Sequence, residues 1–344
     1  MKKNVDGINL IKILAVFLVM CIHQLGRIGF YTTIVGSSNT MTLLTILYPL
    51  LLSCVPLFLI ATGYLLSERT ITLSHYWKIS TFLIEVAVTL LITQISLTLF
   101  NTEQAPLSFL AALTKNFSNP PYYIGLYFSL YLISPFFNHL FHSLDTKQKR
   151  LLCLICLITI CAPSFINNLF SISLMESRFS HMWIVLYYFI GLMIKDFKPH
   201  LKSVHGFLIL AVTGCLYATF VWFMRNGYSY DYKGVIILGY YENIFTVVAS
   251  TTIFICLYSI KFQTNMIRFI CRNLSKLSLT FYLISGLFSD SIAITIYPPT
   301  PLLKTNLISL LIIPFMSFIL ALPVALLCKC ITQQIFLLLK FLHK

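Results

Sequence analysis

Long apolar stretches set the strongest constraint on how this chain can fold. A helix needs roughly 17 to 25 predominantly apolar residues to cross a hydrocarbon core of ~30 Å, and ten runs of this kind follow one another in the sequence. They cover residues 8–26, 43–66, 79–100, 122–141, 151–170, 179–195, 206–224, 240–260, 277–297 and 307–328. Since backbone groups in lipid need hydrogen-bond partners within their own segment, such runs fold as helices. The sequence predicts an all-α integral membrane protein with about ten transmembrane helices.

The composition excludes a water-soluble enzyme, because 58% of the residues are hydrophobic and only 10% are charged, whereas a soluble domain carries roughly 25% charged residues. The first run is too long for a cleaved signal peptide, and no small-residue cleavage site follows it. We therefore expect it to remain as a membrane helix. The segment after the last run is short, so we expect residues 1–344 to form a single transmembrane domain without an appended soluble domain.

The distribution of the 24 lysines and arginines, which gives a net charge of +14, predicts the orientation in the membrane. Most of these residues lie in short connectors rather than on one solvent-facing patch, so nucleic acid is not expected as a partner. Seventeen fall at the two termini and in every second connector, six fall in the remaining connectors, and Lys12 lies inside the first run. Because positively charged connectors stay in the cytoplasm, both chain termini are predicted to be cytoplasmic.

The cysteines favour neither a disulfide framework nor a metal site. Most of the 10 cysteines lie inside apolar runs, where free thiols behave as small hydrophobic groups. Cys153 and Cys156 have the C-x-x-C spacing, but no second Cys or His pair nearby completes a tetrahedral site. We therefore expect no bound metal and no resident cofactor.

Two ionisable residues share one face of the first apolar run. An ionisable side chain in a membrane helix costs about 2.5 to 3.5 kcal/mol on insertion scales, so each one needs an explanation. Lys12 and His23 are eleven positions apart, which places them within roughly 20° around the helix and about 16 Å apart along its axis. Taken alone, Lys12 is explained by snorkelling, in which its side chain reaches the headgroups. Taken alone, His23 is explained by a structural hydrogen bond to a neighbouring helix as well as by a functional role.

Two acidic residues also lie inside apolar runs. Glu85, in the run 79–100, either pairs with Lys12 or remains protonated in an apolar site. Asp290 belongs to a polar patch with Ser285, Ser289 and Ser291. This patch either lines a water-filled cavity or holds a neutral acid that is hydrogen-bonded to the serines.

Three connectors are candidates for contacts outside the helices. The segments 101–121 and 225–239 are the longest polar stretches on the predicted outer side, and we expect them to cover the outer face. The inner connector 261–276 carries four basic residues. These residues suit an anionic ligand or anionic lipid headgroups, and lipid is the simpler explanation.

Five features resemble one known family. Lys12 and His23 enclose ten residues, and four further stretches follow at VPLFLIATGYLL (55–66), YIGLYFSLYLISP (123–135), HMWIVLYYFIGL (181–192) and LSLTFYLI (277–284). In this order they resemble the Arg/Lys-x10-His signature and the later motifs of acyltransferase family 3, whose multi-spanning membrane enzymes acylate surface glycans and related molecules. The resemblance covers most of the chain and also implies ten helices with cytoplasmic ends.

The sequence departs from this family pattern at three places. The arginine of the first helix is Lys12 here, which keeps the charge but loses bidentate phosphate geometry. The run His75–Lys78 stands where a paired-arginine segment is frequent, and Ser285 stands where a histidine often follows. These departures affect the secondary site residues but leave His23 in place.

The resemblance implies transfer of an acyl group, most simply acetyl, from cytoplasmic acyl-CoA to a hydroxyl of a cell-surface or capsular polysaccharide or its lipid-linked precursor. It implies that His23 is the general base and that Lys12, Lys78 and His75 lie where the CoA phosphates are held. Candidate cavity residues, among them donors to the thioester carbonyl, are Tyr64, Glu85, Tyr127, Ser285 and Asp290. Direct transfer and an acyl-enzyme intermediate both fit this pattern.

The expected setting is a bacterial cytoplasmic membrane, where acyl-CoA, a glycan acceptor, the lipid bilayer and polysaccharide biosynthesis proteins are the partners. Two alternatives remain from the residues themselves. A transporter or flippase for a glycan or lipid-linked sugar would also line its path with intramembrane charges. A non-catalytic partner of a polysaccharide synthase is the third possibility.

Overall fold

The computed structural model describes residues 6–32, 38–100, 122–170, 181–227, 241–284 and 309–342, and in these ranges all regular structure is helical. The helices are α1 (Asp6–Arg27), the 3-10 turn η1 (Phe30–Thr32), α2 (Asn39–Leu52), α3 (Cys54–Leu66), α4 (Leu73–Trp77), α5 (Ile79–Phe100), α7 (Tyr122–Ser143), α8 (Thr146–Phe170), α9 (Trp183–Phe197), α10 (Ser203–Gly227), α12 (Ile244–Leu257), α13 (Asn265–Lys276) and α15 (Ser309–Leu342). A further helical segment at residues 278–284 follows α13. The all-α prediction is confirmed for this part of the chain.

Six helical segments of the described ranges are long and apolar enough to cross a membrane. They are Asp6–Arg27, Asn39–Leu66, Leu73–Thr93, Tyr123–Ser143, Ser203–Met224 and Leu310–Leu338. The predicted runs 151–170, 179–195 and 240–260 are helical as α8, α9 and α12, but α9 and α12 have only 15 and 14 residues. The run 277–297 is described only as far as residue 284. The number of ten and the cytoplasmic termini therefore stay predictions.

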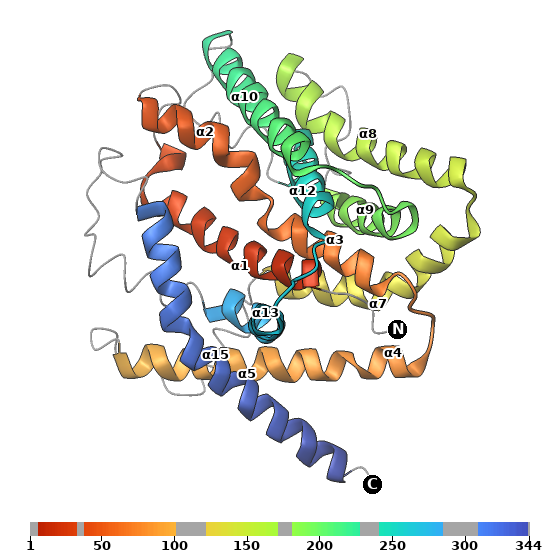
Figure 1. Ribbon diagram of the computed structural model, residues 1–344, viewed down its shortest axis with the longest axis vertical. Helices are drawn as coiled ribbons and strands as arrows, with labels where there is room; N and C mark the ends of the chain where they lie inside the picture. The colour runs from red at the N-terminus through yellow and green to blue at the C-terminus, as the bar shows by residue number, and fades with distance from the viewer. Residues whose placement is uncertain are drawn as a thin grey trace.

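Helix α3 lies at the centre of the molecule, between α1 and α9 (Figure 1). Every residue from Cys54 to Gly63 is buried, as expected for a helix that is apolar on all sides. Its closest neighbour is α9, where Gly63 and Gly191 meet. A Cβ atom on Gly191 would collide with the backbone carbonyl of Ile60, and one on Gly63 with that of Tyr188. The two glycines thus allow the backbones of α3 and α9 to touch.

Proline divides the second membrane segment into α2 and α3. Pro56 has no N–H to bond the carbonyl of Leu52, so the regular helix is interrupted there. Ser53, which lies in the break, donates from Oγ to the carbonyl of Pro49 at 2.8 Å. The predicted run 43–66 therefore forms one membrane segment made of two helices.

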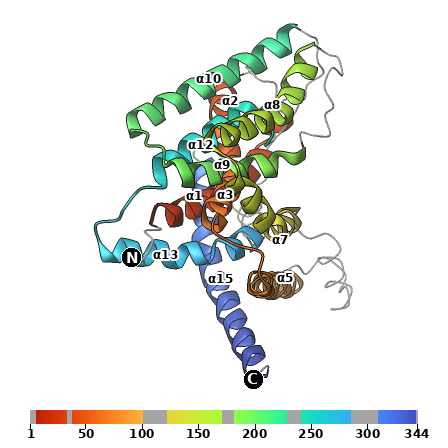
Figure 2. The ribbon, with the colours of Figure 1, turned by 90° about the vertical axis from the view of Figure 1, so that its right-hand side faces the viewer.

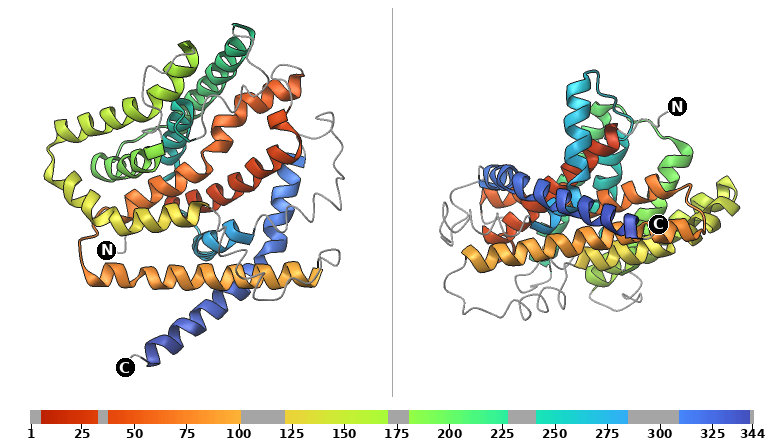
Figure 3. Two further views of the ribbon diagram at one scale, coloured as in Figure 1. Left: turned by 180° about the vertical axis from the view of Figure 1, so that it is seen from behind. Right: turned by 90° about the horizontal axis from the view of Figure 1, so that it is seen from below.

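Helices α5 and α15 pack against each other on the far side of α1. Figure 1 and the left-hand view in Figure 3 show them crossing. Helix α15 has 34 residues and continues well beyond residue 328, where the last apolar run was expected to end. After Pro323 no proline or glycine interrupts the apolar sequence up to Leu342, so the helix continues, and its C-terminal part extends away from the other helices (Figure 2).

Candidate functional site

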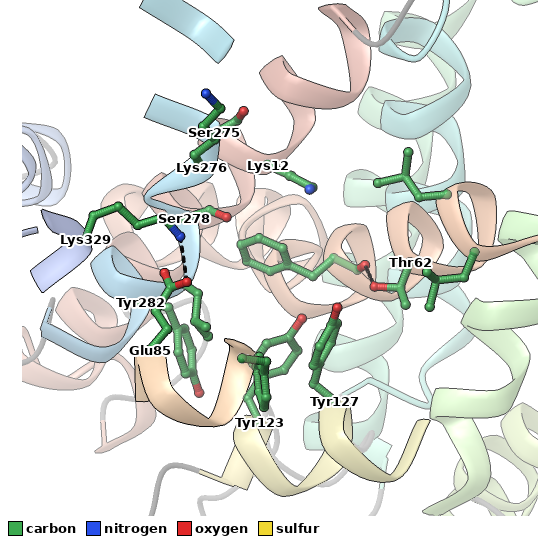
Figure 4. A pocket seen from close by; sticks show the side chains of 15 residues that line it. Lys12, Thr62, Glu85, Tyr123, Tyr127, Ser275, Lys276, Ser278, Tyr282 and Lys329 are labelled. Atoms are coloured by element: carbon green, nitrogen blue, oxygen red, sulfur yellow. Dashed lines mark hydrogen bonds and ion pairs between the residues drawn. The ribbon is translucent and has the colours of Figure 1, made fainter. Parts of the chain in front are cut away.

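A pocket of about 350 Å³ lies between α1, α3, α5, α7 and α15, close to the C-terminal end of α13 (Figure 4). Its described lining consists of Lys12, Phe58, Thr62, Leu65, Leu66, Phe82, Glu85, Tyr123, Tyr127, Ser275, Lys276, Ser278, Leu279, Tyr282 and Lys329. These residues come from segments that are far apart in the sequence. The pocket therefore exists only in the folded bundle.

Four of the five stretches that carry the family resemblance meet at this pocket. Lys12 comes from the first, Thr62 from the second, Tyr127 from the third and Tyr282 from the last. The remaining stretch, residues 181–192, packs behind α3 through the contact of Gly191 with Gly63. The shared location gives these separate sequence motifs a common structural explanation.

A buried ion pair forms one side of the pocket. The Nζ of Lys329 lies 2.6 Å from Oε2 of Glu85, and the hydroxyl of Thr280 donates to Oε1 at 3.0 Å. The side chain of Glu85 is 8% exposed and that of Lys329 is 25% exposed. Of the two alternatives considered for Glu85, pairing is thus observed, but its partner is Lys329 from α15 and not Lys12.

The pocket carries an excess of positive charge. Lys12, Lys276 and Lys329 contribute three ammonium groups, and Glu85 contributes one carboxylate. Within the described residues, no carboxylate forms an ion pair with Lys12 or Lys276, and Figure 4 shows Lys12 directed toward the same space as Thr62. This arrangement suits a ligand with negative charge, because a lysine binds phosphate as a point charge.

A second wall of the pocket is aromatic. The ring centroids of Phe82 and Tyr127 are 4.8 Å apart, those of Tyr123 and Tyr282 are 5.1 Å apart, and Phe58 lies 5.7 Å from Tyr123. Figure 4 shows Tyr123 and Tyr127 rising from α7 into the pocket. A ligand that combines an anionic end with an apolar or polarisable portion therefore matches both walls.

His23 lies on α1 about 16 Å beyond Lys12, calculated from the helical rise. Its side chain is exposed, and the described lining of the pocket includes Lys12 but not His23. The structure therefore joins Lys12, Glu85 and Tyr127 in one pocket and places the imidazole outside that lining. Ser285, Asp290 and the outer segments 101–121 and 228–240 lie outside the described residues.

Three other candidate residues lie away from the pocket. His75 is buried, with its ring stacked on Tyr131 at a centroid distance of 4.3 Å, and its Nε2 lies 3.0 Å from the Tyr131 carbonyl. The Tyr131 hydroxyl in turn donates to the His75 carbonyl at 3.0 Å, so this pair fastens α4 to α7. Lys78 is exposed at the end of α4. Tyr64 packs against the ring of Tyr258.

Lys276 and Lys329 were not singled out from the sequence. Both stand near the ends of apolar runs, where a lysine is already explained as a cytoplasmic topology signal. Their common position in the pocket depends on contacts between distant helices, and no local pattern in the sequence indicates it. The one signal in the sequence was Glu85 itself, because a carboxylate inside an apolar run calls for a cation from another helix. This signal does not say which helix supplies the cation.

The fold and the site define a multi-helical membrane protein with a cationic pocket enclosed by its helices. The family model of Acyl_transf_3, described as an acyltransferase domain, matches residues 5–332, nearly the whole chain. The chain belongs to this family and is thus a membrane acyltransferase. Comparison with curated proteins and with solved structures gives no match.

Proposed function

We propose that the protein is a membrane O-acyltransferase, most simply an O-acetyltransferase. It moves an acyl group from cytoplasmic acyl-CoA to a hydroxyl of a cell-surface or capsular polysaccharide, or of its lipid-linked precursor. The observation that carries this proposal is the pocket with Lys12, Lys276 and Lys329, on which four family-like stretches converge. The corresponding location is the cytoplasmic membrane of a bacterium, with polysaccharide biosynthesis proteins as partners.

The two walls of the pocket match the two parts of an acyl-CoA. Its phosphates carry several negative charges, which the ammonium groups of Lys12, Lys276 and Lys329 would bind. The pantetheine arm and the acyl group would lie along the aromatic wall that includes Tyr123 and Tyr127. The predicted topology supports this assignment, because it places the start of α1 on the cytoplasmic side, where acyl-CoA is present.

His23 is the proposed general base. The distance of about 16 Å between Lys12 and His23 along α1 is one that an extended pantetheine arm spans. A neutral imidazole takes the proton from the acceptor hydroxyl while the hydroxyl oxygen attacks the thioester carbonyl. Collapse of the tetrahedral adduct breaks the carbon–sulfur bond, and CoA leaves as a thiolate that takes up the proton held by the His23 imidazolium, which restores the neutral base. The products are the acylated acceptor and free CoA.

The proposed reaction is tested by the acyl content of the surface polysaccharide. Cells with wild-type protein, with His23→Ala and without the gene are compared, and base-labile acyl groups are measured by proton NMR before and after mild alkaline treatment. We expect these groups to be lost in the variant and in the deletion, with unchanged polymer yield. His205→Ala, at an exposed histidine on α10, is the matched control and should retain acylation.

The same experiment separates the enzyme from a transporter. A flippase is required for export, so its loss would reduce the amount of polymer rather than its acyl content. Full acylation by a well-expressed His23→Ala protein would remove the catalytic role of the imidazole.

For Lys12, we expect Lys12→Met to raise the KM for acetyl-CoA about tenfold through loss of a charge-assisted contact, whereas Lys12→Arg stays close to wild type.

A further inference from the structure

Polar contacts hold most of α13 against the rest of the protein, and of its large apolar side chains only Leu274 packs against the hydrophobic core. Arg268 Nε lies 3.2 Å from Oδ2 of Asp6, at the start of α1, and the hydroxyl of Ser275 donates to Oδ1 of Asn9 at 2.8 Å. Arg268 also donates to the carbonyl of Phe262 at 2.7 Å. These hydrogen bonds and this ion pair fix the orientation of α13. An amphipathic helix of a soluble protein, by contrast, usually packs against its core with an apolar stripe.

The apolar side of α13 consequently faces outward. Met266 is 73% exposed, Phe269 is 68% exposed, Ile267 is 48% exposed and Ile270 is 42% exposed. At about 100° per residue, these four side chains spread over roughly 160° of the helix surface, and the centre of this sector lies opposite Arg268 and Ser275. A contiguous patch of large apolar side chains on a helix that is too short to span a bilayer requires an apolar environment.

The direction of α13 agrees with a position at the surface of a membrane. Figure 1 shows α13 nearly end-on while α1, α3 and α5 run across the view, and the right-hand view in Figure 3, from below, shows it running across the direction of α5. It is attached at the N-terminal end of the spanning helix α1. A helix in this place lies along the membrane surface when the spanning helices cross it.

The charges that α13 and the segment before it carry are all positive. The segment 261–276 contains Lys261, Arg268, Arg272 and Lys276 and no acidic residue. Arg268 is paired with Asp6, while Lys261 and Arg272 are exposed. A helix with an apolar face and exposed basic side chains binds to membranes through buried apolar area and through attraction to anionic lipids.

We propose that α13 lies in the bilayer interface on the side of the α1 N-terminus, with Met266, Phe269 and their apolar neighbours among acyl chains and with its basic residues on anionic phospholipid headgroups. This inference does not depend on the proposed reaction. Because Ser275 and Lys276 at the end of α13 also line the pocket, the lipid contact holds one edge of the pocket at a fixed depth.

The lipid contact is tested by photo-crosslinking in the full-length protein. A benzophenone amino acid replaces Phe269, and the protein is reconstituted in an equimolar bilayer of phosphatidylcholine and phosphatidylglycerol. We expect lipid adducts whose masses show enrichment of phosphatidylglycerol. The matched control places the same amino acid at Asn265, which is exposed at the polar side of α13, and should give far fewer lipid adducts.

The headgroup contact is tested by the double variant Lys261→Gln and Arg272→Gln. Since each basic residue near an anionic surface contributes about a fivefold preference, this variant should reduce the enrichment of phosphatidylglycerol severalfold. The charge-preserving variant Lys261→Arg and Arg272→Lys should keep it. Size-exclusion profiles check that each protein is folded. Adducts with protein only, or equal labelling of both lipids by the wild type, would overturn the proposal.

Discussion

Glu85 connects three parts of the molecule through one buried carboxylate. It lies on α5, accepts from Thr280 in the helical segment 278–284 and pairs with Lys329 on α15. Its side chain is 8% exposed, whereas that of Lys329 is 25% exposed and has partial access to solvent. The two partners therefore differ in what their loss leaves behind. Without Lys329, a buried negative charge lacks its partner, and this is the costly case.

We expect Lys329→Met to destabilise the protein by roughly 3 kcal/mol. Glu85→Gln should cost only about 1 kcal/mol, because the amide oxygen still accepts one hydrogen bond, from Thr280 or from Lys329, and Lys329 has partial access to solvent. The double variant Glu85→Gln/Lys329→Met should be more stable than Lys329→Met alone. The measurement is the thermal unfolding midpoint of each purified variant in the same detergent. Additive losses in the double variant would contradict a coupled pair.

Sequence reasoning selected part of the pocket lining, because an ionisable side chain inside a membrane helix needs an explanation. Lys12 and Glu85 were selected in this way, and both line the pocket. Tyr127 was selected from the family resemblance and lies there as well. For Glu85 the sequence left two alternatives open, a pair with Lys12 or a protonated acid, and the observed partner Lys329 was neither of them. The partner depends on how α5 and α15 pack, which the sequence does not encode locally.

At the scale of helices, the contact between α3 and α9 depends on the absence of side chains at Gly63 and Gly191. Both glycines belong to stretches that resemble family motifs, residues 55–66 and 181–192. The structure explains these motifs by packing, because a Cβ on either glycine would meet backbone of the opposite helix. Backbone atoms cannot move aside as the end of a flexible side chain can, so the two helices would have to separate.

Gly191→Ala should therefore lower the stability by roughly 1 to 3 kcal/mol through overpacking. Gly125→Ala in α7 is the matched control, because a Cβ at Gly125 would have no neighbour within 4 Å. There, alanine should be neutral or stabilising by up to about 1 kcal/mol, since it favours the helix more than glycine does. Thermal unfolding of both variants in detergent decides the matter, and equal midpoints would exclude the packing explanation.

The long apolar runs predicted where helices form more reliably than where they bend or end. The break at Ser53 follows from Pro56, yet the whole run 43–66 is apolar and gives no other sign of it. Helix α15 continues to Leu342, because its apolar sequence has no breaker after Pro323. Helix α13 was expected only as a basic connector, since its four basic residues hid the apolar side that the helical spacing creates.

At the scale of the whole molecule, the predicted topology and the pocket agree on one side of the membrane. Lys12 lies near the start of α1, Lys276 at the end of α13 and Lys329 in the later part of α15. With the N-terminus in the cytoplasm, each of these positions falls toward the cytoplasmic side. The basic residues that orient the protein would thus also supply the charge that holds an anionic donor.

This topology can be tested with two kinds of fusion. Alkaline phosphatase is active only outside the cytoplasm, whereas green fluorescent protein that is fused to a membrane protein of the general secretion route fluoresces only when it stays in the cytoplasm. Fusions after Lys202 and after Lys344 should fluoresce, and a fusion after Lys233 should have phosphatase activity, because the basic residues are concentrated on alternate connectors. Fluorescence at Lys233, or phosphatase activity at Lys344, would contradict the orientation.

The decisive position for the number of spans is Arg178, between α8 and α9. Helix α9 has only 15 residues, about 23 Å of helix at 1.5 Å per residue, which is short for a hydrocarbon core of ~30 Å. If both helices nevertheless cross, a fusion after Arg178 has phosphatase activity, as ten spans require. If both remain on the inner side, the same fusion fluoresces and the count falls to eight, while the predicted sides of Lys202 and Lys344 stay unchanged. We expect phosphatase activity, because the stretch 181–192 packs against the central helix α3 through Gly191, and that contact requires α9 to lie at the depth of the membrane core.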